Sequence, residues 1–325
     1  MALTSLGGLN RPPACWRPYA DSSPFNTLLP ANPKLVGNSS GIVSRLVGFG
    51  TMDDLTAGKA ETANDYGRPV YFASSSDPLY TVHCTEPWGT CAIEGATINI
   101  PATATAASGS DGHMSVIDTV TGTEYDFWQA GALPAPGGTL DIAWGGSTQI
   151  GGNGLGSAAT AADFGSYAGV VRLEELQAGA INHALFMYAS CDSGTFVYPA
   201  SKSGASCSSI GQSNTNAPPM GTRLQLNMTD AQISALAVPA WKKTILTAMA
   251  HYGLIMGDTG SSWGIKEESG RVYTAYGAPD QWAAWAQTQP GVTSWNGISY
   301  FDLAGGVDWQ SKLRVIAPCV SQATC

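Results

Sequence analysis

Short apolar and polar runs alternate through the first half of the chain. Between Pro69 and Trp144, segments rich in Val, Ile, Tyr and Thr are separated by clusters of Gly, Pro and Ser. Runs of this kind, bounded by turn residues, predict β-strands. The predicted strands are Val70–Ala73, Tyr80–His83, Thr97–Ile100, His113–Asp118, Glu124–Gln129 and Leu140–Trp144.

The second half of the chain mixes strand and helix patterns. Strands are predicted at Ile181–Tyr188, Arg223–Met228 and Leu313–Ile316. Strict alternation in Arg223–Met228 predicts one buried face and one wet face. The longest helix is predicted from Pro239 to Gly253, because its apolar residues fall on one stripe. Shorter helices are expected at Val171–Gln177, at Asp280–Thr288 and after the capping-box pair Thr229 and Gln232.

The chain shows no fixed-period repeat and no clear linker, which favours a single domain over residues 1–325. We expect an all-β fold, a jelly-roll-like β-sandwich with one long and a few short peripheral helices. Residues 1–40 are expected to form an extended arm packed on it. The arm is rich in Pro from Arg11 to Pro33 and carries the aromatic residues Trp16, Tyr19 and Phe25, which call for burial.

Composition narrows the classes of partner. Charged residues make up 12% of the 325 residues, about half the usual share. The net charge of -9 argues against nucleic acid as a partner. No apolar stretch approaches the roughly 18 residues of a membrane span.

The cysteines point to an oxidising compartment. Six of the seven fall into close pairs, Cys84 with Cys91, Cys191 with Cys207 and Cys319 with Cys325, and Cys15 is left over. Local disulfides of this kind are typical of secreted proteins. We therefore expect an extracellular protein whose signal peptide has been replaced by an initiator Met. Free buried thiols in a cytosolic protein are the alternative.

A predicted hairpin gathers chemically useful side chains. With a two-residue turn at Thr121-Gly122, Ile117 would pair with Asp126 and Ser115 with Trp128; a three-residue loop would change this register. One face would carry His113, Ser115, Glu124, Asp126 and Trp128. The core face would carry Met114, Val116, Tyr125 and Phe127.

This patch suits sugar chemistry. Trp128 would stack on a pyranose ring, and a pair of carboxylates is what glycoside hydrolysis requires. For Glu124, a solvated strand face is the favoured interpretation. Asp126 is the stronger candidate, because its neighbour Trp128 would otherwise be exposed to solvent for no evident reason.

A second cluster surrounds His183, which begins a strand that is apolar on both faces. A buried imidazole needs a hydrogen-bond partner, and Glu175 or Asp111 could supply it. Such a histidine can act in acid–base chemistry or simply bond a backbone carbonyl. No cofactor is predicted. A divalent metal held by His113, His183 and a carboxylate is a weaker alternative, because the chain has no H-x-H or H-x-x-H spacing.

Several stretches resemble a large, mainly actinobacterial group of secreted bacterial proteins whose reaction is not established. They include Ser22 to Asn26, Asp111 to Trp128, Arg172 to His183, Val197 to Ala200, Pro219 to Arg223 and Ala248 to Asp258. The resemblance covers about residues 15 to 270 and implies secretion. In that group's pattern, Asp111, His113, Asp126, Arg172, Glu175 and His183 match, whereas Glu124 does not.

The leading hypothesis is a secreted enzyme that cleaves glycosidic bonds of a polysaccharide or oligosaccharide. Asp126 and Glu175 would form the carboxylate pair, His113 and His183 would relay protons, and Asp111 would orient an imidazole. Substrate would be held by Trp128, Arg172, Arg223 and Tyr188. A polysaccharide lyase and a non-catalytic glycan-binding protein are the alternatives; a carboxylate peptidase is weaker because no peptidase motif is present.

Overall fold

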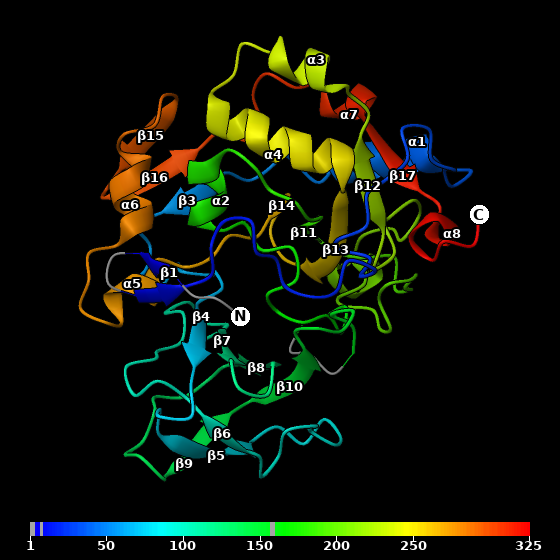
Figure 1. Ribbon diagram of the computed structural model, residues 1–325. Helices are drawn as coiled ribbons and strands as arrows, with labels where there is room; N and C mark the ends of the chain where they lie inside the picture. The colour runs from blue at the N-terminus through cyan, green and yellow to red at the C-terminus, as the bar shows by residue number, and fades with distance from the viewer. Residues whose placement is uncertain (1–3, 7–8, 157–159) are drawn as a thin grey trace.

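The computed structural model describes residues 4–6, 9–156 and 160–325, and strands are its main elements (Figure 1). The N-terminal strands are β1 (Thr4–Leu6), β2 (Leu9–Arg11) and β3 (Leu55–Ala57). They are followed by β4 (Val70–Ala73), β5 (Leu79–Cys84), β6 (Thr97–Asn99), β7 (Met114–Asp118), β8 (Thr123–Trp128), β9 (Thr139–Ile142) and β10 (Trp144–Gln149). The remaining strands are β11 (Leu185–Ala189), β12 (Arg223–Leu226), β13 (Leu254–Thr259), β14 (Trp263–Ile265), β15 (Val292–Trp295), β16 (Ile298–Phe301) and β17 (Leu313–Ile316).

Helices are short except for one. They are α1 (Ser39–Val47), α2 (Leu173–Ala178), α3 (Asp230–Ser234), α4 (Ala240–His251), α5 (Arg271–Thr274), α6 (Gln281–Ala286), α7 (Trp309–Lys312) and α8 (Pro318–Ser321), with a 3-10 turn at Cys207–Ile210. The predicted long helix is confirmed as α4. The capping box of Thr229 and Gln232 is also confirmed, at the start of α3.

The large lobe, which we define as β3 and β11 to β17 with their helices, is built on a five-stranded sheet in the order β14-β11-β13-β12-β17. Helix α4 packs against β12 at this sheet (Figure 1). The prediction of a wet face on Arg223–Met228 is wrong, because Arg223 and Gln225 are both buried. β12 is an inner strand of the sheet, and both of its faces are covered.

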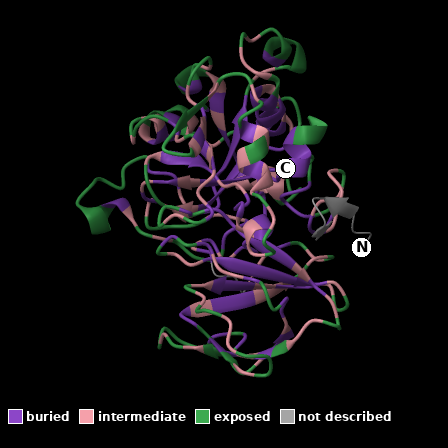
Figure 2. Cartoon of the chain, turned by 90° about the vertical axis from the view of Figure 1, so that its left-hand side faces the viewer, coloured by how far each residue is buried: buried purple, intermediate pink, exposed green. Residues whose placement is uncertain are grey.

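The small lobe, which we define as β4 to β10, contains a four-stranded sheet in the order β10-β8-β7-β4 and a three-stranded sheet in the order β6-β5-β9. Its core is a separate hydrophobic cluster that includes Tyr80, Met114, Val116, Phe127 and Leu140. Figure 2 shows buried strands in both lobes. The predicted core face of the hairpin is therefore confirmed.

A β-rich fold with few helices is confirmed, whereas a jelly-roll-like sandwich is not. The strands form several small sheets, and the pairs β4–β7, β5–β9 and β11–β13 are parallel. A jelly roll is built from antiparallel Greek keys. The sheets therefore combine parallel and antiparallel strand pairs, unlike the jelly roll that the sequence predicted.

The hairpin of β7 and β8 keeps its predicted faces but not its predicted register. Ser115 pairs with Asp126 and Ile117 with Glu124, because the connection is longer than a two-residue turn. The register differs by two residues, so each side chain stays on its predicted side. The polar face is buried, however, rather than open to solvent: Glu124 and Asp126 are both 0% exposed.

The segment after β2 lies across the body as a largely irregular arm. Tyr19 O–H donates to Glu124 of the small lobe at 2.7 Å. Further along, Ala184 N–H donates to Phe25 O at 2.6 Å, and Leu29 N–H donates to His251 O at 2.7 Å. The arm therefore contacts both lobes. Residues 1–3 and 7–8 of the predicted arm lie outside the described residues.

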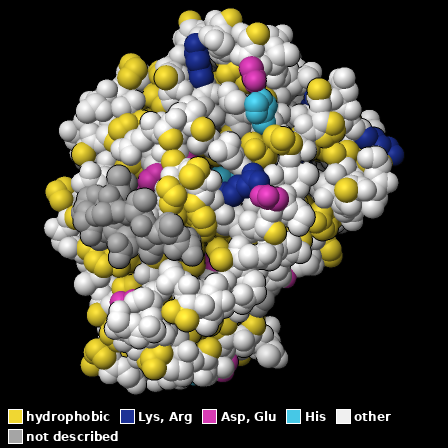
Figure 3. All heavy atoms as spheres, in the orientation of Figure 1, with side chains coloured by type: hydrophobic (Ala, Val, Ile, Leu, Met, Phe, Trp, Pro, Cys, Tyr) yellow, Lys and Arg dark blue, Asp and Glu magenta, His cyan; other side chains and the backbone are white. Residues whose placement is uncertain are grey.

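All three predicted disulfides are present, Cys84–Cys91, Cys191–Cys207 and Cys319–Cys325, and Cys15 is a free, exposed thiol. Within the described residues, no helix is long and apolar enough to cross a membrane. On the face drawn in Figure 3, charged side chains are sparse.

Candidate functional site

Two cavities lie where the lobes meet. One has a volume of about 570 Å³ and the other about 440 Å³. Asp111, Asp258 and Thr259 line both of them, so the cavities adjoin. We call them the acidic cavity and the aromatic cavity after the side chains in their walls.

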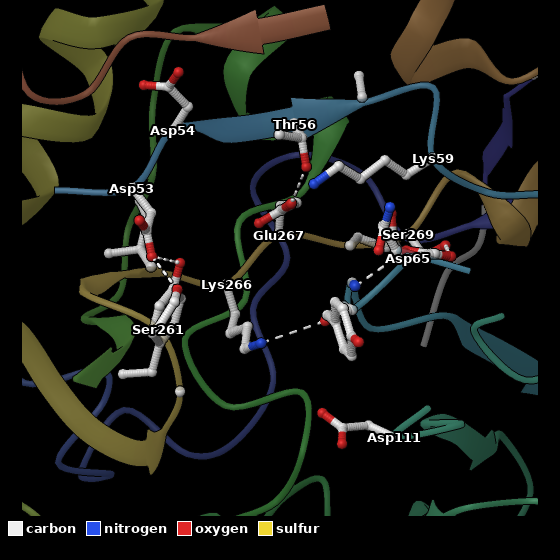
Figure 4. A pocket seen from close by; sticks show the side chains of 18 of the residues that line it. Asp53, Asp54, Thr56, Lys59, Asp65, Asp111, Ser261, Lys266, Glu267 and Ser269 are labelled. Carbon is white, nitrogen blue, oxygen red and sulfur yellow. Dashed lines mark hydrogen bonds between the residues drawn. The ribbon is translucent and has the colours of Figure 1, made fainter. Parts of the chain in front are cut away.

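The acidic cavity owes its name to seven carboxylic residues in its wall. They are Asp53, Asp54, Asp65, Asp111, Asp258, Glu267 and Glu268. Figure 4 shows carboxylates on several sides of the cavity, with Lys59 and Lys266 among them. Most come from the segment around β3 and from the segment after β14. Long-range pairing of the large lobe therefore assembles this wall.

Asp53 is held by two hydroxyl groups. Tyr188 O–H donates to its Oδ2 at 3.0 Å, and Ser261 O–H donates to the same oxygen. Burial and the nearby Asp53 charge raise the pKa of Tyr188, so its phenol stays protonated and remains a donor. One carboxylate oxygen of Asp53 is thereby fixed in the cavity wall.

Glu267 follows β14 and lies near two lysines. Thr56 O–H, on β3, donates to Glu267 Oε1 at 3.2 Å. Burial raises the pKa of Glu267, although the charges of Lys266 and Lys59 oppose this shift. Lys59 extends toward Glu267 in Figure 4. A carboxyl with a raised pKa is suited to donate a proton.

Charged groups meet where the two cavities join. Arg68 donates to Asp258 Oδ2 at 3.3 Å, and His113 Nε2 lies 3.7 Å from Asp111 Oδ2. Burial, together with the Arg68 and Lys266 charges, lowers the pKa of His113 well below its usual value. The imidazole is therefore neutral, and its Nδ1 has no hydrogen-bond partner among the described residues.

The aromatic cavity contains three tryptophans. Trp128 and Trp144 are cross-strand partners on β8 and β10. The ring of Trp88 lies 5.3 Å from that of Trp128 and 5.9 Å from that of Trp144, measured between centroids. Trp88 is 60% exposed and belongs to the loop that the Cys84–Cys91 disulfide closes. The three rings form an accessible apolar platform beside Asp111 and His113.

Asp126 lies outside the described walls of both cavities. It accepts Ser115 O–H at 2.6 Å and Ser166 N–H at 2.9 Å. Its neighbour Glu124 accepts Tyr167 N–H at 2.9 Å. These bonds hold the loop after β10 against β8, which is a structural role.

Of the two partners considered for His183, Glu175 is the one in contact, at 2.9 Å between Glu175 Oε1 and His183 Nε2. Arg172 donates to the same oxygen at 2.8 Å. All three side chains are buried, and none is among the described residues that line the two cavities. The Arg172 and His183 charges lower the pKa of Glu175, although burial alone would raise it. The cluster fastens the start of α2.

Of the predicted substrate-binding residues, Trp128 and Tyr188 line cavities and the arginines do not. Arg223 donates to Tyr252 O and to Thr27 O, so its guanidinium is engaged with backbone carbonyls. Asp111 and His113 also lie at the cavities. The predicted set is thus divided between the cavities and the interior.

No family model, curated protein or solved structure matches this chain.

Sequence reasoning missed Asp53, Glu267, Trp88 and Trp144 as candidates. An isolated acidic pair at Asp53-Asp54 and the run Lys266-Glu267-Glu268 were visible in the sequence, but nothing local links them. Among the described residues, no group of three or more His, Cys, Asp or Glu side chains is placed to hold a metal ion. His113 and His183 lie in different clusters.

Proposed function

We propose that this protein is an extracellular glycoside hydrolase whose substrate lies across the two adjoining cavities. The observation that carries the proposal is the joining of an accessible tryptophan platform to a cavity rich in carboxylic residues. Indole rings stack on the apolar faces of sugars, and two carboxylic groups are the usual machinery for glycosidic cleavage. The local disulfides fit secretion.

Glu267 is the proposed general acid. Its raised pKa keeps a proton available, which it would transfer to the leaving glycosidic oxygen as the C–O bond breaks. Asp53 is the proposed second carboxylate, acting on the anomeric carbon directly or taking a proton from the attacking water. Its position is fixed by Tyr188 and Ser261. These roles replace those first assigned to Asp126 and Glu175.

Elimination is a less suitable chemistry for this site. A lyase must neutralise the carboxylate of a uronic acid with a cation. Arg172 and Arg223 are engaged inside the protein, and Lys59 and Lys266 lie among a larger number of carboxylic residues. The acidic cavity would also repel a uronate. Non-catalytic glycan binding is the second candidate, because the exposed Trp88 and its two neighbours suffice for stacking without any acid.

The test is a panel of neutral, amino and acidic polysaccharides incubated with the wild-type protein, Glu267→Gln, Asp53→Asn and Asp141→Asn. New reducing ends and ultraviolet absorbance are both measured. Asp141 is exposed on β9, away from the described walls of both cavities, and serves as the charge-matched control. We expect reducing ends without absorbance, a loss of roughly 100-fold or more in each site variant, and no loss in the control.

Three results would contradict this assignment. Full turnover by both Glu267→Gln and Asp53→Asn would remove these residues from the chemistry. Binding to the panel without any product would instead establish the non-catalytic alternative. Products that absorb in the ultraviolet would mean elimination.

A further inference from the structure

The balance of charge in the acidic cavity points to the kind of sugar it would accept. Seven carboxylic residues line it, against Lys59 and Lys266. Two of the seven are partnered by arginines: Glu268 by Arg11 and Asp258 by Arg68. Of the other five, Glu267 holds a proton in its proposed role, and Asp53, Asp54, Asp65 and Asp111 still outnumber the two lysines. The cavity therefore presents a surplus of acidic groups to whatever enters it.

A buried oxygen in the wall adds a second, independent observation. Glu268 is 1% exposed, and its Oε1 has no hydrogen-bond partner among the described residues. Arg11, the cation that bonds the other oxygen of Glu268, is shared with Glu174, so a positive group in the cavity would stabilise the Glu268 carboxylate through space without contacting Oε1. Sugar hydroxyls can donate, but an ammonium group supplies three donors and a positive charge.

The aromatic cavity favours an amino sugar over other cationic ligands. A basic peptide would satisfy the carboxylates, and a cationic side chain could lie over one indole, but the peptide brings no sugar ring faces to stack on three clustered indoles. A sugar polymer with amino groups uses both, since its ring faces stack on Trp88, Trp128 or Trp144 while its ammonium groups reach the neighbouring carboxylates. Asp111 and Asp258 line both cavities and would lie between these two sets of contacts.

We propose that the two cavities select a glycan that carries free amino groups, with the ammonium in the acidic cavity and neighbouring rings on the tryptophan platform. This inference rests on the proposed glycan-active function and names its substrate class. Asp54 is the best residue for testing the charge term, because it is exposed in the cavity wall and has no proposed part in the chemistry.

The experiment compares two probes with the same backbone, a β-1,4-linked glucosamine hexamer and its fully N-acetylated counterpart. Affinities are measured by calorimetry at low and high salt for the wild-type protein, Asp54→Asn and the control Asp141→Asn. We expect the glucosamine hexamer to bind about tenfold more tightly at low salt. That preference should shrink with added salt, as expected for exposed charges. It should shrink in Asp54→Asn and stay unchanged in Asp141→Asn.

Outcomes for the substrate class and for hydrolysis can be separated. Equal or tighter binding of the acetylated hexamer overturns the amino-sugar inference, and cleavage of that hexamer would leave the hydrolase proposal standing. Tighter binding of the glucosamine hexamer without cleavage supports the inference and contradicts hydrolysis. Failure of both hexamers to bind overturns the inference. Equally tight binding of trilysine also overturns it, because the selectivity would then be for charge alone.

Discussion

At the scale of single residues, burial decides which acidic groups can do chemistry. Glu124 and Asp126 alternate with apolar neighbours on β8 as solvent-facing residues would, yet both are fully buried. What covers them is Tyr19 from the arm and the loop that contains Ser166 and Tyr167. Alternation predicts the side of a strand correctly, but it cannot reveal a distant segment that covers that side.

The buried pair predicts a specific dependence of stability on pH. Burial raises the pKa of both Glu124 and Asp126, so the folded protein keeps protons that the unfolded chain loses above about pH 4.5. This contribution to stability is complete in acid and is lost as the pH rises through the folded pKa values. Glu124→Gln removes one of the two charges, and a glutamine can still bond Tyr19 and Tyr167.

We therefore expect the melting temperature of Glu124→Gln to exceed that of the wild-type protein increasingly from pH 5 to pH 9, by roughly 2 °C at the upper end. Thermal unfolding monitored by circular dichroism measures this difference in melting temperature. Parallel curves for the two proteins would show that Glu124 does not titrate in this way. Asp141→Asn should follow the wild-type curve, since Asp141 is exposed.

The candidate site likewise combines residues that local sequence patterns indicated with residues that only the folded chain brings together. Asp111, His113, Trp128 and Tyr188 were predicted as candidates, and each stands in or beside a predicted strand. Asp53 and Glu267 are more than 200 positions apart and meet only because β3 and the segment after β14 fold together. The local sequence around either residue gives no indication of the other.

At the scale of elements, strong periodic segments were predicted well. The bounds of β4 and β17 agree with the sequence prediction, and α4 lies within its predicted range. By contrast, β13 follows α4 after Gly253 and was not predicted, although it is a central strand of the large lobe. The first four residues of β13 are all buried, so the strand has no alternation to reveal it.

The disulfides also belong to this scale, and we expect them to contribute unequally to the free energy of unfolding. Cys191 and Cys207 are both 0% exposed and lie in their own hydrophobic cluster, whereas Cys319–Cys325 closes a shorter loop at an exposed end. Loop-closure entropy favours the longer loop. Replacing Cys191 and Cys207 by alanine should lower the free energy of unfolding by about 3 kcal/mol, against about 2 kcal/mol for Cys319 and Cys325.

Chemical denaturation of the two double variants measures this difference. Equal losses would mean that chain entropy and burial do not govern the contribution of these bonds.

At the scale of the whole molecule, the N-terminal segment joins the two lobes and supports a cavity wall. Arg11 is buried and bonds both Glu174 and Glu268, and Glu268 belongs to the acidic cavity. Its guanidinium also lies 5.2 Å from the centre of the Tyr273 ring. The N-terminal segment therefore contributes a charge to the interior of the large lobe, which the sequence pattern of the arm did not indicate.

Replacement of Arg11 by methionine should leave both glutamates buried without their cation. We expect a loss of roughly 3 kcal/mol in unfolding free energy at pH 8. Burial raises the pKa of Glu268 to about 7, so its protonated form dominates in acid. The loss should therefore be smaller at pH 5, where this carboxyl is neutral.

Urea denaturation at the two pH values measures both losses. Arg17→Met provides the comparison, because Arg17 pairs with the exposed Asp21 and donates to the carbonyls of Asn26 and Asn182 but bonds no buried carboxylate. Its loss should therefore be the same at both pH values. An equal loss at pH 5 and pH 8 would contradict the electrostatic explanation and leave only lost packing.

The short loop between Cys84 and Cys91 has a consequence for how tightly a ligand can bind. An exposed tryptophan on an open loop would have to be immobilised whenever a sugar stacked on it, and that lost freedom would weaken the complex. The disulfide restricts the backbone on both sides of Trp88 before any ligand arrives. The conformational entropy of this loop is therefore lost during oxidative folding and not when a ligand binds. Reduction of this one disulfide should slow or weaken ligand binding, while the strands that carry Trp128 and Trp144 stay intact.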